Sequence, residues 1–118
     1  MITYRPRTQS KRWLDGDCPS GVLAIYDNPE FADRYTVLYK PLKLKPYHET
    51  WIMGRGMSSH PYHPQGFGMS FENQAHEIVA YRNRSTRKAC RWSDLPPDVQ
   101  RCVREDCAEA EVWRTLDA

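Results

Sequence analysis

The sequence predicts an α+β fold, in which an antiparallel β-sheet of about four to six strands has one C-terminal α-helix packed on it. Two segments, 22–26 and 34–39, are rich in aliphatic, β-branched and aromatic residues, which favours strands. Strong turn formers, Asp-Asn-Pro at 27–29, lie between them, so we expect a hairpin with a loop of about seven residues. Near the C-terminus, Pro97 opens a stretch with apolar residues at helical spacing, which indicates an amphipathic helix.

The expected helix runs from about residue 97 to about residue 114. The side that we expect to face the sheet comprises Val99, Cys102, Val103, Ala110 and Trp113. Asp106 falls on the same side, and an unpaired buried carboxylate is costly. We therefore expect either partial exposure of Asp106, which is the simpler interpretation, or a partner such as an arginine.

Further short strands are expected at 49–53, 69–71 and 77–81. Between the first two of them, the segment 54–68 holds four of the six glycines together with two prolines. We expect this segment to be a long irregular loop, and loops of that kind are usually functional or disordered.

The length of 118 residues suits one domain, so we expect residues 1–118 to form a single unit. Residues 1–20 are polar, basic and rich in turn formers, which favours a loosely held N-terminal arm or edge segment. The net charge is only +2, and such a mild charge does not predict a nucleic-acid partner.

No stretch of the sequence has the features of a membrane span or a secretory signal. We therefore expect a cytoplasmic protein without a membrane partner. The four cysteines are expected to be reduced thiols, because nothing in the sequence indicates export. They are Cys18, Cys90, Cys102 and Cys107.

The segment 57–68 is the strongest candidate for ligand binding. Its glycines can expose backbone N–H groups to an anion, its serine and glutamine can donate hydrogen bonds, and its aromatic rings can stack on a planar base. The candidate residues are Ser58, Tyr62, Gln65, Gly66, Phe67 and Gly68. A rigid connector stiffened by prolines is an equal alternative, because no regular phosphate-binding motif is present.

A second candidate feature is a basic run over 82–91 that contains no acidic residue. Arginine forks suit phosphate recognition, whereas a solvated edge strand guarded by positive charge is the alternative. For any single arginine we favour the edge interpretation, and for the cluster we favour phosphate binding. The arginines expected to hold phosphates are Arg34, Arg55, Arg82, Arg84 and Arg91.

Metal binding and catalysis have little support. His60 and His63 are three residues apart, but the sequence has no Cys-x-x-Cys pair, so we expect no metal and no cofactor. A catalytic set could be drawn from Ser58, His60 and Asp33, yet there is no nucleophile elbow, so we expect no enzyme. Basic neighbours could lower the pKa of Cys90, although a small buried residue is the simpler interpretation.

Three segments carry a resemblance to known proteins: DRYTV at 33–37, the path from 57–58 to PQGFG at 64–68, and WSDLPPDVQ at 92–100. In order and spacing they resemble a family of short proteins encoded by bacteriophages, and the resemblance covers roughly residues 22–107. Some phage proteins of this size, among them the anti-Thoeris sponges, bind cyclic ADP-ribose-type or cyclic-oligonucleotide immune signals. Those sponges have an antiparallel sheet, helices and an oligomeric assembly.

The resemblance implies a counter-defence protein in the host cytoplasm that sequesters a small nucleotide ligand and forms a homo-oligomer. The residues alone leave two other functions open. One is a protein-directed inhibitor of a host defence enzyme, as an anti-CRISPR protein is. The other is a small nucleotide-cleaving enzyme, which the lack of a catalytic set argues against.

Overall fold

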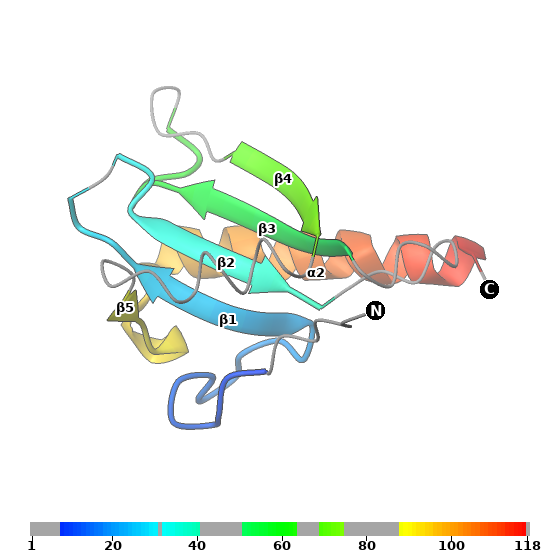
Figure 1. Cartoon of the computed structure of the whole chain (residues 1–118), viewed down its shortest axis with the longest axis horizontal. Helices are drawn as coiled ribbons and strands as arrows, with labels where there is room; N and C mark the ends of the chain where they lie inside the picture. Colours follow the sequence, from blue (N-terminus) through cyan, green and yellow to red (C-terminus); the bar gives the residue numbers. More distant parts are fainter. Residues whose placement is uncertain (1–7, 31, 41–50, 64–68, 75–87, 118) are drawn as a thin grey trace.

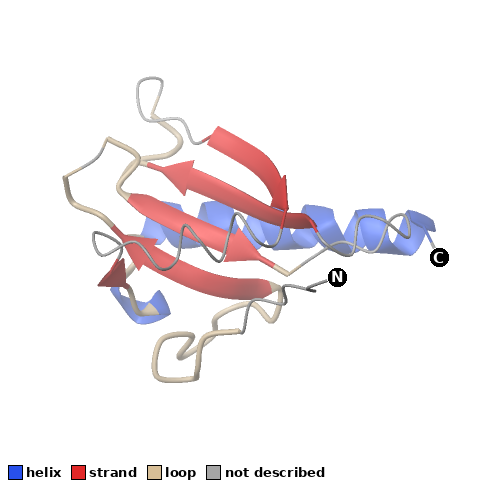
Figure 2. Cartoon of the chain, viewed as in Figure 1, coloured by secondary structure: helices blue, strands red, loops and turns tan. Residues whose placement is uncertain are grey.

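The computed structural model describes residues 8–30, 32–40, 51–63, 69–74 and 88–117. In these residues a five-stranded antiparallel sheet, with the strand order β4-β3-β2-β1-β5, lies against one long helix (Figures 1 and 2). The elements are β1 (Val22–Asp27), β2 (Tyr35–Tyr39), β3 (Trp51–Met57), β4 (Met69–Gln74), β5 (Lys88–Ala89), the 3-10 helix η2 (Trp92–Asp94) and α2 (Pro97–Asp117). The α+β fold predicted from the sequence is confirmed.

The hairpin of β1 and β2 forms the centre of the sheet, as the sequence predicts. Ile25 pairs with Val37 and Tyr26 with Thr36. The backbone N–H of Asn28 donates a hydrogen bond of 2.7 Å to the carbonyl oxygen of the residue that precedes β2, which closes the loop. The two strands therefore form one rigid unit on which β3 and β5 pair from either side.

Strand β3 is longer than expected. The sequence predicts a strand at 49–53 followed by an irregular loop, but β3 continues through Gly54 and Gly56 to Met57. At Gly56 another segment lies close: a Cβ atom added there would lie 3.4 Å from the Cβ of Asp33, which is van der Waals contact. Glycine in a strand often marks such a close approach of another segment.

Of the remaining expected strands, one lies within the described residues and one lies outside them. Strand β4 begins at Met69 as predicted and extends to Gln74. The strand expected at 77–81 and the remainder of the expected loop, 64–68, lie outside the described residues.

The main hydrophobic core lies between the sheet and α2, which runs behind the sheet in Figure 1. Strand β2 contributes alternate residues to this core, and α2 contributes three of the residues expected on its buried side. Together they are Tyr35, Val37, Tyr39, Val99, Cys102 and Val103, all at most 9% exposed. A second buried cluster lies on the other face and comprises Leu23, Ala24, Tyr26 and Leu38. The central strands are therefore buried on both faces.

Residues 8–20 are bound to the fold along the edge of β1, which fits the edge segment, one of the two arrangements expected from the sequence, rather than the loose arm. The backbone N–H of Gln9 donates to the carbonyl oxygen of Leu23 at 2.9 Å. The side-chain oxygen of Gln9 accepts a hydrogen bond of 2.9 Å from the backbone N–H of Ile25. Leu14 is buried in the main core. These contacts satisfy backbone groups at the edge of β1, which is why the segment is held in place.

None of the described helices combines the length and the hydrophobicity that a transmembrane helix needs.

Two valines on α2 provide a matched test of the core. Val103 is fully buried, whereas Val112 is 57% exposed on the same helix. We expect Val103→Ala to lower the free energy of unfolding by about 2 kcal/mol, because it removes two buried methyl groups and leaves a small cavity. Val112→Ala should change it by less than about 0.5 kcal/mol. Urea denaturation measures both values, and equal effects would contradict this placement of the helix.

Candidate functional site

Arg34, which we expected to bind phosphate, is engaged with a carboxylate at the hairpin. Its Nε and one terminal nitrogen donate to the two carboxylate oxygens of Asp27 at 2.7 and 3.0 Å. This two-point geometry is the one that arginine also uses with phosphate. The hydrogen bond to Asp27 raises the pKa of the guanidinium above its ordinary value. A phosphate could reach Arg34 only by sharing or displacing this partner.

Arg55 also pairs with a carboxylate, here between the sheet and the helix. One terminal nitrogen donates to a carboxylate oxygen of Asp106 on α2 at 2.7 Å. The hydroxyl of Tyr39 donates to the other oxygen of Asp106 at 2.5 Å. The expected arginine partner of Asp106 is thus present, and the carboxylate is also partly exposed. Burial nevertheless raises the pKa of Asp106, which the two hydrogen bonds oppose.

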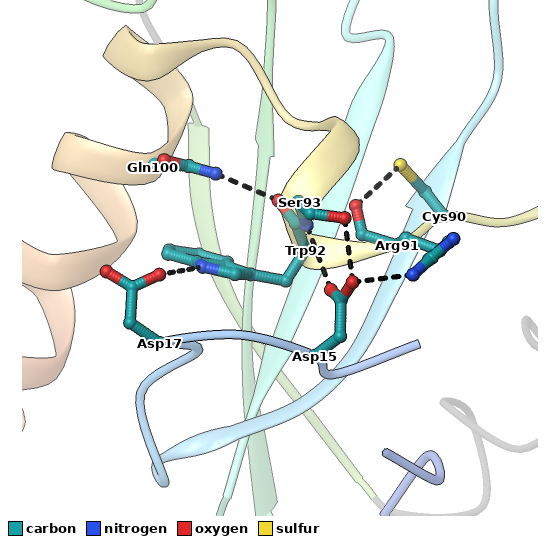
Figure 3. Close-up of polar contacts among 7 residues, drawn as sticks. All are labelled: Asp15, Asp17, Cys90, Arg91, Trp92, Ser93 and Gln100. Carbon is teal, nitrogen blue, oxygen red and sulfur yellow. Dashed lines mark hydrogen bonds and ion pairs between the residues drawn. The ribbon is translucent and has the colours of Figure 1, made fainter. Parts of the chain in front are cut away.

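Arg91 belongs to a cluster at the start of the C-terminal region (Figure 3). A terminal nitrogen of Arg91 donates to Asp15 at 2.9 Å. The same carboxylate accepts hydrogen bonds from the hydroxyl and the backbone N–H of Ser93, at 2.7 and 3.0 Å. These contacts, the Ser93 hydroxyl first, lower the pKa of Asp15 to about 2. Arg91 therefore helps to hold the N-terminal segment onto η2.

A neighbouring carboxylate, Asp17, holds the buried side chain of Trp92. The indole N–H of Trp92 donates to Asp17 at 2.8 Å, and Arg104 of α2 donates to the other oxygen at 2.7 Å. Gly16 lies between the two aspartates with a φ of 57°, a conformation that residues with a side chain rarely adopt. This glycine lets Asp15 and Asp17 both reach the same short region of the chain.

Tyr62 lies in the loop after β3, and its side chain contacts the exposed surface of α2. Its hydroxyl donates to a carboxylate oxygen of Glu105 at 2.6 Å, and its side chain is 41% exposed. The guanidinium carbon of Arg101 lies 4.0 Å from the centre of the ring, which is within the range of a cation–π contact. Desolvation and the bond to Glu105 raise the pKa of Tyr62 to about 12.

The expected site residues therefore fall into two groups. Arg55 and Tyr62 meet neighbouring residues of α2, Asp106 and Glu105, and Ser58 lies between them in the chain. Arg34 and Arg91 contact the hairpin and the N-terminal segment instead. The remaining candidates lie outside the described residues: Gln65, Gly66, Phe67, Gly68, Arg82 and Arg84.

The surroundings of Cys90 and Ser58 do not favour the reactive thiolate and the catalytic serine that were considered for them. Cys90 is buried, and burial raises the pKa of its thiol to about 11, so it is not a reactive thiolate. The Ser58 hydroxyl accepts a hydrogen bond of 3.3 Å from the backbone N–H of His60, which is a local turn contact. Within the described ranges, no group of three histidine, cysteine or acidic residues is arranged to hold a metal ion.

Sequence reasoning missed Arg101 and the carboxylate partners of Arg34, Arg91 and Arg104, whereas an arginine partner for Asp106 was one of the expected arrangements. The four ion-paired arginines of the described chain are Arg34, Arg55, Arg91 and Arg104. Within the same residues, Arg101 makes no ion pair and contacts the ring of Tyr62. Most of these partners are far apart in the sequence; Arg55 and Asp106, for example, are 51 positions apart. No local sequence pattern therefore predicts which residues pair.

Comparison with protein-family models, with curated proteins and with solved structures finds no match to this chain.

Arg55 can be tested as a structural residue. Arg55→Met should lower the free energy of unfolding by about 1–3 kcal/mol, because Asp106 keeps its charge without its ion-pair partner. The loss should be smaller than for a fully buried pair, since the two side chains are 25% and 19% exposed. Urea denaturation should also show partial recovery in Arg55→Met/Asp106→Asn. An unchanged stability of Arg55→Met would contradict the structural role.

The lowered pKa of Asp15 makes the stability of the fold depend on pH. Its folded-state pKa of about 2 lies below the ordinary value of 3.8, so the ionised side chain stabilises the fold above pH 3.8. This stabilisation is lost as the pH falls from 3.8 towards 2. We expect the stability advantage of the native protein over Asp15→Asn, measured by urea denaturation, to shrink across this range. Glu30→Gln, which changes an exposed carboxylate in the hairpin loop, is the matched control. A stability advantage over Asp15→Asn that stays constant across this pH range would contradict the role of Asp15.

Proposed function

We propose that this protein binds and sequesters a phosphate-bearing nucleotide immune signal, of the cyclic ADP-ribose or cyclic-oligonucleotide type, without converting it. It would thereby act as a bacteriophage counter-defence protein in the host cytoplasm. The observation that carries the proposal is the exposed contact between Tyr62 and Arg101 on the surface of α2. The resemblance to phage-encoded sponges supplies the biological setting, and it also implies assembly into a homo-oligomer.

Arg101 supports phosphate binding because its guanidinium is exposed and interacts with Tyr62, with Asp98 and Glu105 as charged neighbours that are not paired with it in a salt bridge. It is exposed, and in the described part of the chain it makes no ion pair, unlike Arg34, Arg55 and Arg91. A phosphate at Arg101 would not have to displace a carboxylate. Arginine–phosphate hydrogen bonds are among the stronger charge-assisted contacts in proteins.

Tyr62 supports recognition of a base. Its hydroxyl is held by Glu105 at 2.6 Å, which limits rotation of the ring before any ligand arrives. Stacking of a base on an aromatic side chain contributes about 1–3 kcal/mol, and a pre-oriented ring loses little entropy on binding. Ser58 and the candidate segment 65–68 flank Tyr62 in the sequence, so they are natural sources of further hydrogen bonds.

The proposed site is accordingly narrower than the one expected from the sequence. Arg34, Arg55 and Arg91 are assigned first to the stability of the fold, because each already holds a carboxylate. Ligand binding is assigned to Ser58, Tyr62 and Arg101, together with the glycine-bearing segment and the arginines at 82 and 84.

A protein-directed inhibitor is the second candidate, and the same ion pairs favour it. Neutralised arginines make a weaker phosphate site but are compatible with a surface that binds another protein, where charged pairs at the rim contribute to specificity. Such an inhibitor would ignore nucleotides and would co-purify with a host defence enzyme.

The test is a thermal-shift screen against cyclic ADP-ribose isomers and cyclic di- and trinucleotides, followed by chromatography of the ligand released on boiling. A ligand at 100 times its dissociation constant adds about 2.7 kcal/mol of stability, which corresponds to a rise in Tm of roughly 10 °C for this size. Recovery of unchanged ligand supports sequestration, whereas recovery of a changed ligand supports the enzyme. No shift with any nucleotide overturns both and favours the protein-directed inhibitor.

Variants locate the site. We expect Arg101→Gln and Tyr62→Leu each to weaken binding of the identified nucleotide at least about tenfold, which corresponds to the loss of one charged or stacking contact. Arg12→Gln is the matched control, because Arg12 also lies over an aromatic ring, that of Trp13, at 5.2 Å. Calorimetric titration measures the affinities, and a normal affinity in both site variants would move the site elsewhere.

A further inference from the structure

Two half-buried cysteines, Cys18 on the N-terminal segment and Cys107 on α2, lie at the junction where that segment contacts α2. Cys18 and Cys107 are 89 positions apart in the sequence, yet both pack against the main hydrophobic core. All four cysteines are thiols in this structure, but Cys90 and Cys102 are buried, whereas Cys18 and Cys107 are partly exposed.

The segment around Cys18 is attached to α2 on both sides of this residue. Before it, Asp17 accepts a hydrogen bond of 2.7 Å from Arg104. After it, Gly21 lies against Cys107, with 3.4 Å between the Sγ and the position that a Cβ of Gly21 would occupy. Arg104 and Cys107 are three residues apart in a helix and so lie on the same face. Cys18 is therefore held between two points that contact neighbouring positions on α2.

The electrostatics of the two thiols agree with this geometry. Burial raises the pKa of Cys18 to about 11, and the second cause is the charge of a Cys107 thiolate. The turn that contains Cys18 is also well ordered by backbone hydrogen bonds, from Cys18 N–H to Asp15 and from Val22 N–H to Pro19, each 3.2 Å. These bonds give the segment that carries Cys18 a defined backbone position beside α2.

We propose that Cys18 and Cys107 form a reversible disulfide that fastens the N-terminal segment to α2. With glutathione disulfide as the oxidant, one cysteine thiolate attacks a glutathione sulfur and releases one glutathione thiolate. The second cysteine thiolate then attacks the protein sulfur of the mixed disulfide and releases the other glutathione. The two cysteines lose two protons and two electrons in total, and glutathione disulfide is reduced to two glutathione molecules.

The bond would act on the same junction that Asp15 and Asp17 hold. Closing a loop of this length restricts the unfolded chain strongly, so the oxidised protein should unfold at a higher temperature. The raised pKa of Cys18 makes its thiolate scarce at neutral pH, so the bond should form faster as the pH rises.

The experiment is incubation of the full chain with glutathione disulfide at pH 7 and pH 8.5, followed by intact mass measurement and peptide mapping without reduction. We expect a mass lower by two hydrogen atoms, a peptide pair joined through Cys18 and Cys107, and a Tm higher by roughly 5–15 °C. Reduction by dithiothreitol should reverse all three changes.

Matched serine variants make the result decisive. Cys18→Ser and Cys107→Ser should each abolish the mass change, whereas Cys90→Ser and Cys102→Ser should retain it. The proposal is overturned if the native chain keeps four thiols, if it accumulates only glutathione adducts, or if either cysteine is joined to a different partner.

Discussion

The buried residue Trp92 links the N-terminal segment, η2 and α2, which are otherwise separate. Its backbone N–H donates to the carbonyl oxygen of Trp13 at 2.7 Å, and its own carbonyl oxygen accepts from Gln100 of α2 at 3.0 Å. Its ring nitrogen is satisfied by Asp17, so a side chain that is only 1% exposed leaves no polar group unpaired there. The position of the N-terminal segment, of η2 and of the first turn of α2 relative to the sheet therefore depends on this one residue.

The second general feature is the use of carboxylates. Asp15, Asp17, Asp27 and Asp106 each hold an arginine, and each pair joins different elements or the two arms of the hairpin. Partly exposed pairs of this kind each add modestly to stability, and they also fix the orientation of the elements that they join. Three of the arginines expected to bind phosphate, Arg34, Arg55 and Arg91, are thus used within the fold, and the proposed binding surface shifts to Tyr62 and Arg101.

Much of the fold could be predicted because its signals are local. The alternation of Tyr35, Val37 and Tyr39 predicts a strand with one face in the core, and Pro97 with the apolar spacing after it predicts α2. Strand β3 was predicted too short because Gly54 and Gly56 resemble loop residues, although both occupy paired positions of the strand, opposite Leu38 and Thr36.

The candidate site could be predicted only in part for the same reason. The sequence pointed to Tyr62, to the arginines and to an arginine as one possible partner of Asp106, but it gave no sign of Arg101 or of the partners of Asp15. What the sequence determined by itself was the periodicity of its strands and helix, because neighbouring side chains fix that pattern. Only the tertiary structure decided which charges neutralise one another and which stay exposed, because those contacts join residues as much as 87 positions apart.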